Sequence, residues 1–261
     1  MIEDIRYSKK INWIVFAFFA VLMAALLFWF DRAWGDDAAA VQIAQKTFQA
    51  MGGMDQWKAT AAVRFDFVVD VKGNPPRSVK HLWDRKNSRD HVEWSRDGKT
   101  TIAWVDLRTR SGSAWQDDKK LDGEALQKAL DTAYGRWIND TYWLIMPFKL
   151  LDPGVILTHE GEKDGYDVLH LSFQKVGMTP RDQYWAYVNK TTGLMDRWEY
   201  LLEDEKEKES WNWKEWGQYG ALKLSKWKES PDGKTRIGFE PLQILDSADP
   251  ALFGEELKTL D

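Results

Sequence analysis

Hydrophobic and polar residues alternate along most of the chain, which is the pattern of strands that bury one face. The clearest run begins at Ala61, where Phe65 and Phe67 fall on one face and charged residues fall between them. Similar runs cover residues 79–84, 90–95, 101–107, 155–160, 166–173, 183–189, 194–202, 211–216, 221–227 and 235–244. Between two of them, the segment NKTTGL predicts a tight hairpin with Gly193 at positive φ. The pattern therefore predicts about eleven short antiparallel strands.

Two stretches change to the helical period, in which apolar residues recur every three or four positions. The first covers residues 37–51, with Asp36 and Asp37 as candidate N-caps and a Gly-Gly pair as its stop. The second begins after Asp122 and carries an apolar stripe that runs into the apolar segment 143–148. One curved sheet with helices against its concave face would bury both patterns. We therefore expect a mainly β fold of the α+β type.

Residues 11–30 form an apolar run in which Asn12 is the only polar side chain. Twenty residues at about 1.5 Å each span about 30 Å, the thickness of a bilayer's hydrocarbon core. Basic residues concentrate before the run, so we expect residues 1–10 in the cytoplasm. These patterns predict a transmembrane signal-anchor helix at 11–30 and an exported domain at 36–261. The competing interpretation is a signal peptide that is cleaved near residues 33–35.

Composition restricts the chemistry that the chain can perform. The absence of cysteine excludes disulfides, thiolate metal sites, cysteine nucleophiles and lipid attachment at cysteine. The net charge is −5, and the first ten residues carry three basic and two acidic side chains, which leaves −6 for the remainder. An acidic chain has little affinity for phosphate backbones, so we expect no nucleic-acid partner.

The sequence lacks the usual signatures of enzymes and metal sites. No phosphate-binding loop, dinucleotide fingerprint or G-x-S-x-G motif occurs. Adjacent acidic residues fall in expected loops, where they indicate a solvated surface. Four histidines fall in different predicted strands without metal-binding spacing: His81, His91, His159 and His170. We therefore expect no metal, no cofactor and no catalytic residue.

Tryptophan is unusually frequent, with sixteen residues, most of them in or beside predicted strands. Large rings could fill the concave side of a sheet that has no second sheet to pack against. The same rings could line an apolar cavity for acyl chains, or stack on sugars. Both interpretations stay open at the level of the sequence.

Two segments carry a family resemblance, NDTYWLIMPFKLLDPG at residues 139–154 and YWAYVNKTTGLMDRWEY at residues 184–200. Together with the opening AQKTFQAMGGMDQW, these segments cover roughly residues 40–253. This part of the chain resembles the LolA-like family of bacterial outer-membrane lipoprotein-sorting proteins. The resemblance implies an unclosed β-barrel of about eleven antiparallel strands, in which helices cover an apolar cavity for acyl chains. Family members act as non-enzymatic carriers or sensors in the periplasm. This chain departs from the soluble carrier in its expected anchor, and no cavity-gating arginine can be matched to a position.

Together these features predict a membrane-tethered periplasmic protein that binds lipids or lipoproteins as a carrier, acceptor or chaperone, without catalysis. It would cross the inner membrane once, through residues 11–30, with its C-terminal domain in the periplasm. Acyl chains are the expected ligands, and further protein partners would lie in the cell envelope. The expected ligand-binding residues are Trp137, Trp143, Met146 and Phe148.

Two alternatives use the same fold differently. The chain could be an interaction or sensor module of an inner-membrane complex that holds no ligand inside, or, as the weaker alternative, a carbohydrate-active enzyme. An empty apolar interior would favour lipid binding, and a filled interior would favour the interaction module. Two facing carboxylates in a tryptophan-lined cleft would favour the enzyme.

Overall fold

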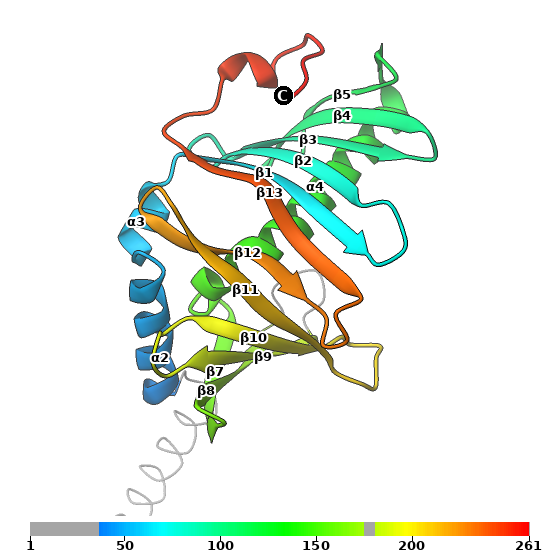
Figure 1. Ribbon diagram of the computed structural model, residues 1–261. Coiled ribbons are helices and arrows are strands. Elements are labelled where there is room, and N and C mark those ends of the chain that lie inside the picture. The colour runs from blue at the N-terminus through cyan, green and yellow to red at the C-terminus, as the bar shows by residue number, and fades with distance from the viewer. Residues whose placement is uncertain (1–36, 175–180, 261) are drawn as a thin grey trace, which may run out of the picture.

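The computed structural model describes residues 37–174 and 181–260. In these residues thirteen strands form one antiparallel sheet in the order β6-β5-β4-β3-β2-β1-β13-β12-β11-β10-β9-β8-β7 (Figure 1). The sheet consists of two meanders, β1 to β6 and β7 to β13, which are joined where β13 pairs with β1. The outermost strands, β6 and β7, do not pair with each other, so the curved sheet stays unclosed.

The observed strands follow the sequence alternation closely. In the first meander they are β1 Ala62–Val71, β2 Arg77–Asp84, β3 Arg89–Arg96, β4 Lys99–Asp106, β5 Gly112–Gln116 and β6 Lys119–Lys120. In the second they are β7 Val155–Lys163, β8 Tyr166–Phe173, β9 Gln183–Asn189, β10 Met195–Leu201, β11 Glu209–Tyr219, β12 Leu222–Glu229 and β13 Thr235–Leu245. The hairpin between β9 and β10 is confirmed, with Gly193 at φ 73°.

The expected number of about eleven strands was too low for the described residues, because β5 and β6 were not predicted. Both are short, and β6 consists of two exposed lysines that carry no alternation signal. Strand β5 begins at Gly112, where a Cβ atom would lie 1.9 Å from the Trp104 carbonyl oxygen. Because glycine has no side chain, the backbone of β5 can approach β4 closely at this point. In the sequence a glycine at this position indicates a turn and not the start of a strand.

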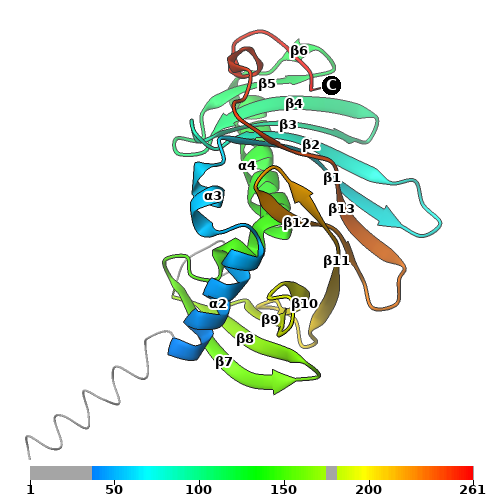
Figure 2. The same ribbon diagram turned by 60° about the vertical axis from the view of Figure 1, so that its left-hand side comes forward.

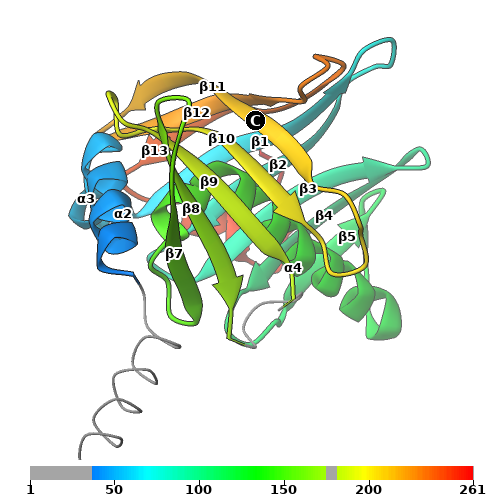
Figure 3. The ribbon, with the colours of Figure 1, turned by 90° about the horizontal axis from the view of Figure 1, so that it is seen from below.

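The helices lie on the concave side of the sheet, as expected from their apolar stripes (Figure 2). They are α2 Ala38–Ala50, α3 Met54–Ala59 and α4 Gly123–Ile145, which continues into the 3-10 turn η1 Met146–Lys149. Asp37 is confirmed as the N-cap of α2, since its carboxylate accepts a hydrogen bond from the Ala39 amide at 2.9 Å. Seen from below, α4 runs inside the curve of the sheet (Figure 3). The helices thus cover the inner face of the strands.

Among the described residues, three hydrophobic clusters stabilise the fold, the smallest of them formed by Val168, Trp185 and Tyr187 on β8 and β9. The main core lies between the helices and the inner face of the sheet, where Phe148 stacks on Trp57 with ring centroids 5.2 Å apart. A smaller layer lies on the opposite face, where the C-terminal segment with η2 Pro250–Phe253 covers Leu82. There the Trp104 indole N–H donates to the Gly254 carbonyl at 2.7 Å. Both faces of the first meander are therefore covered (Figure 1).

The predictions for the N-terminal region, a cytoplasmic segment at 1–10 and a membrane span at 11–30, lie outside the described residues. Within 37–174 and 181–260, no helix is both long and apolar enough to cross a bilayer.

Candidate ligand-binding interior

The four residues predicted to bind ligand lie in three different places. Met146 and Phe148 are buried in η1, beneath α2 and α3. Trp137 packs against Trp83 of β2, with ring centroids 5.9 Å apart. Trp143 faces the second meander, where its ring centroid lies 4.7 Å from that of Trp198. The structure therefore groups Trp143 with rings that the sequence did not single out as site residues.

These rings form a continuous cluster between the C-terminal end of α4 and strands β9 to β11. We call this cluster the aromatic interior, and its members are Tyr142, Trp143, Tyr184, Trp198, Tyr200, Trp211, Trp213 and Trp216. Neighbouring centroids lie 4.7 to 6.0 Å apart along the path from Trp143 through Trp198 and Trp213 to Trp216. Burial raises the pKa of the Tyr142 hydroxyl well above its usual value. At the edge of the cluster, the Tyr200 hydroxyl and the Trp211 indole donate to the Glu209 carboxylate.

Strand geometry explains why so many rings meet on one face. Trp211 and Trp213 are two residues apart on β11, so both point inward. Glu215 then adopts φ 54° and interrupts the alternation, which allows Trp216 to follow Trp213 on the inner side. The rings of Trp213 and Trp216 are stacked, with an interplanar angle of 28°. A local backbone irregularity thus adds one ring to the cluster.

Three indole N–H groups in the aromatic interior are buried without a hydrogen-bond partner among the described residues. They belong to Trp198, Trp213 and Trp216. Most buried polar groups in folded proteins are paired, and an unpaired donor costs about 1 to 3 kcal/mol. Elsewhere the indoles of Trp104 and Trp185 donate to Gly254 and Glu160. A fourth unpaired indole, that of Trp137, faces the first meander, so three of the four unpaired indoles among the described residues belong to the aromatic interior.

Lys228 of β12 is fully buried beside this cluster. Its ammonium donates to the Ser225 carbonyl at 2.7 Å and lies 4.2 Å from the Trp213 ring centroid. A second ring, that of Phe239, lies 4.4 Å away. Burial lowers the pKa of Lys228 well below its usual value. The sequence analysis missed this residue, which lies one position beyond the strand predicted at 221–227.

A buried charged trio attaches α4 to the first meander. His81 of β2 bonds Asp90 of β3 through Nδ1 at 2.7 Å and Asp140 of α4 through Nε2 at 3.0 Å. Burial opposes a charge on the imidazole, yet the two carboxylates outweigh it and raise the pKa of His81 to about 9. The Phe65 ring stacks on the imidazole with centroids 4.6 Å apart. The trio therefore positions the helix on the sheet.

The trio was not predicted, because its members are far apart in the sequence. His81 and Asp140 are separated by 59 residues, and no spacing rule connects them. In the ranges that the structure describes, no three or more histidine, cysteine, aspartate or glutamate side chains are placed together so that they could hold a metal ion, and this includes the trio. Asp90 and Asp140 share one histidine in the buried core, so they do not face each other across a tryptophan-lined cleft.

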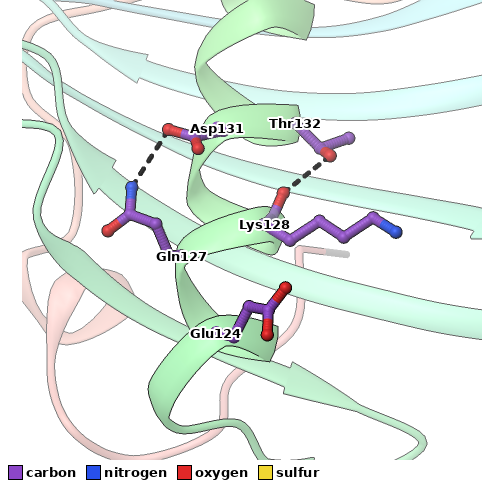
Figure 4. Close-up of a pocket in the computed structure, with 5 residues that line it drawn as sticks. All are labelled: Glu124, Gln127, Lys128, Asp131 and Thr132. Carbon is purple, nitrogen blue, oxygen red and sulfur yellow. Dashed lines mark hydrogen bonds between the residues drawn. The ribbon is translucent and has the colours of Figure 1, made fainter.

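Two of the hollows in the surface of the described residues contain no predicted ligand-binding residue in their lining. One, of about 480 Å³, lies on the exposed side of α4 (Figure 4). There the Gln127 amide donates to Asp131 at 3.0 Å, and the Thr132 hydroxyl donates to the Lys128 carbonyl at 2.8 Å. These polar groups are bonded along the helix itself, as on an ordinary solvated helix face.

The second hollow, of about 410 Å³, lies over the outer face of β7 to β10. The Lys208 ammonium occupies part of it, 3.2 Å from the centroid of the Trp185 ring. Between the helices and the sheet, by contrast, the protein's own side chains fill the space, and Phe148, Met146 and Trp198 are each at most 2% exposed. The interior of this closed form is therefore packed.

Comparison with solved structures finds several proteins of similar fold. A DUF1329 family protein from Desulfovibrio piger covers 83% of this chain and 97% of its own, with 13% identity and a TM-score of 0.49. A LolA superfamily protein from Nitrosomonas europaea covers 83% and 97%, with 8% identity and a TM-score of 0.45. A putative outer membrane lipoprotein-sorting protein domain from Vibrio parahaemolyticus covers 82% and 95%, with 10% identity and a TM-score of 0.44.

No family model and no curated protein sequence matches the chain. Its structural neighbours thus include LolA superfamily and lipoprotein-sorting folds.

Proposed function

We propose that this protein binds the acyl-bearing part of a lipid or lipoprotein between α4 and the inner face of the sheet, without catalysis. The observation that carries the proposal is the set of unpaired buried donors on Trp198, Trp213 and Trp216 within an apolar aromatic wall. The ester or amide carbonyl of an acylated ligand would accept such hydrogen bonds. The acyl chain would pack against the rings and replace contacts that now fill the interior.

Entry of a ligand requires α4 and η1 to move away from the sheet, because the interior is filled in the closed form. The helix satisfies its own backbone hydrogen bonds, so it can move without breaking the strand pairing. In the part of the chain that the structure describes, it is held by apolar side chains, by the hydrogen bond between Asp140 and His81, and by cation–π contacts such as that of Arg136 with Trp94 of β3. In this proposal α4 acts as a cover that opens for the ligand.

The same proposal places the domain beside a membrane, in the periplasm, through a span at residues 11–30. The support is the uncharged length of that run and the basic residues before it. Asp37, the first described residue, already belongs to the fold, because its amide donates to the Leu157 carbonyl of β7 at 3.0 Å. Only a few residues would therefore separate the bilayer from the domain.

A direct test uses brominated acyl chains, which quench tryptophan fluorescence on contact. The full chain, purified in one nonionic detergent, is titrated with 9,10-dibromostearate and with its methyl ester. We expect saturable quenching that Trp143→Phe reduces and that Trp115→Phe, a change of a buried ring on β5, leaves unchanged. Native mass spectrometry of the same preparation should show co-purified lipid. A folded chain with neither saturable quenching nor bound lipid would refute the proposal.

The filled interior favours a second candidate, an interaction module that holds no ligand inside. The outer hollow supports it, because Trp185 and Tyr187 there lie beneath the cationic side chains of Lys208 and Arg197. Substituting Trp185 by alanine would then abolish binding of a protein partner and leave acyl binding untouched. Two substitutions therefore separate the candidates. Acyl binding that requires Trp143 supports the first, and partner binding that requires Trp185 supports the second.

A further inference from the structure

The rings that carry the unpaired donors of the aromatic interior lie next to one another, with Trp213 in the middle. Its centroid lies 5.6 Å from that of Trp198 and 6.0 Å from that of Trp216, and the Lys228 ammonium lies 4.2 Å above it. Lys228 is 0% exposed, and Trp198 and Trp213 are each 2% exposed. A buried cation and three unpaired N–H groups therefore occupy one small region.

No carboxylate forms an ion pair with Lys228 among the described residues, although its neighbours on β12 are paired. Lys226 bonds Glu240 at 2.8 Å, and Lys214 of the adjacent strand bonds Glu229 at 3.0 Å. Within residues 37–174 and 181–260, the only hydrogen-bond acceptor of the Lys228 ammonium is the Ser225 carbonyl. A buried lysine without a counter-charge is costly, because water is replaced by apolar rings and no anion compensates.

The Lys228 ammonium and the three unpaired indole N–H groups are all donors, which defines the chemistry of a missing partner. An ammonium and indole N–H groups have no acceptor function, so they cannot satisfy one another. A carboxylate or phosphate oxygen would accept from several of them at once and would neutralise the lysine. The apolar surroundings, formed by rings such as Phe239 and by Leu224, would suit the chain attached to such a group.

We infer that Lys228, with the indoles of Trp198, Trp213 and Trp216, binds the anionic head group of an acyl ligand inside the protein. The inference rests on the proposed function and specifies its ligand class as an amphiphile with a carboxylate or phosphate next to its chain. Neutral acyl esters would occupy the same apolar walls with lower affinity, since they lack the charge that compensates Lys228.

The test compares an acid with its neutral ester on the same chain. The full chain in nonionic detergent is titrated with 9,10-dibromostearate and with methyl 9,10-dibromostearate, and tryptophan quenching is measured. We expect the acid to bind about tenfold more tightly than the ester. Lys228→Met should bring this ratio to about one without weakening the ester, because the apolar walls are retained. Lys226→Met, which removes a half-buried lysine of the same strand that is paired with Glu240, should keep the ratio.

Several outcomes would overturn the inference. If the wild-type chain binds acid and ester with equal affinity, the anionic head-group site is wrong, although the proposed acyl binding still stands. This comparison needs no variant. A folded Lys228→Met chain that keeps the full preference for the acid would also overturn the inference. If millimolar sodium phosphate displaces the acid, the site serves a free anion and the assignment to a lipid head group is wrong. If neither probe binds the wild-type chain, the proposed function fails first.

Discussion

The two halves of the sheet bury polar side chains in opposite ways. In the first meander the buried imidazole of His81 is bonded on both nitrogens, by Asp90 and Asp140. In the second meander the fully buried base is Lys228, which donates to one carbonyl among the described residues and lies beside the unpaired indole N–H groups of Trp198, Trp213 and Trp216. Native cores rarely leave neighbouring donors unpaired. The first half anchors α4, and the ligand that we propose would bind against the second half.

The covering of the outer face differs in the same way. The C-terminal segment covers the first meander, where the Leu260 amide donates to Glu93 and the Lys80 ammonium donates to the Leu260 carbonyl. Over the second meander the outer face carries the hollow around Trp185. The first half is therefore fixed from both sides, whereas the second half is covered on its inner side.

The largest effect that we expect comes from breaking the buried trio. His81→Leu would leave Asp90 and Asp140 buried without their common partner, at a cost of about 3 to 5 kcal/mol in the free energy of unfolding. Chemical denaturation measures this loss. His170→Leu, at a half-buried histidine bonded to Gln183, is the matched control and should cost much less. Equal costs for the two variants would show that the trio does not anchor the helix.

The next effect concerns the cover over the interior. Met146 is fully buried in η1, so Met146→Ala should lower the free energy of unfolding by about 3 kcal/mol and reduce acyl binding only in proportion. Met146→Glu should abolish quenching by brominated acyl probes in the molecules that remain folded, because the buried charge forces the cover open. Melting temperature and quenching are measured on the same samples. If melting temperature and quenching fall in proportion to each other in both variants, Met146 is only part of the core.

The trio should also make stability depend on pH in the alkaline range. The folded pKa of His81 is raised to about 9 from the ordinary 6.5, so its stabilisation is fully present below about pH 6.5 and is lost as the pH rises through about 9. The difference between the two pKa values limits the loss in the free energy of unfolding to about 3 kcal/mol. The free energy of unfolding is measured between pH 6 and 10 in wild type and in His81→Leu. A wild-type decline no steeper than that of the variant would contradict the assignment.

The smallest expected effect is a gain in stability in the second half. Lys228→Met removes a buried ammonium without a counter-charge and should raise the free energy of unfolding by roughly 1 kcal/mol. Lys226→Met removes one partly exposed ion pair and should change it by about 0.5 kcal/mol or less. Thermal melts of both variants measure the contrast. A strongly destabilised Lys228→Met chain would show that the lysine supports the fold and is not held for a ligand.

The sequence predicted the elements that depend on local pattern. Strand β8 at Tyr166–Phe173 and strand β9 at Gln183–Asn189 have the expected bounds, because alternation and flanking turns determine both. Helix α2 begins after Asp37 as expected, since a carboxylate there satisfies a free amide of the first turn. Helix α3 and strands β5 and β6 were missed, because each is too short to show a period. The anchor at 11–30 stays a prediction.

Site residues were harder to predict than elements. Trp143 was chosen for its place in an apolar segment, and it does face the aromatic interior. Lys228 could not be chosen, because a lysine in a strand is ordinarily solvated and its burial depends on the rings of β11 and β13. The position of Trp216 depends on the irregular backbone at Glu215, which no hydrophobic pattern encodes.

By itself the sequence determined a mainly β chain with helices on one face, no cysteine chemistry, and an excess of tryptophan to be buried. Those properties depend on composition and on neighbours within a few residues. Only the tertiary structure decided that His81 meets Asp90 and Asp140, and that Lys228 lies among indoles without a carboxylate. Such contacts depend on which strands pair and where α4 crosses them, and long-range pairing is not contained in any local period of the chain.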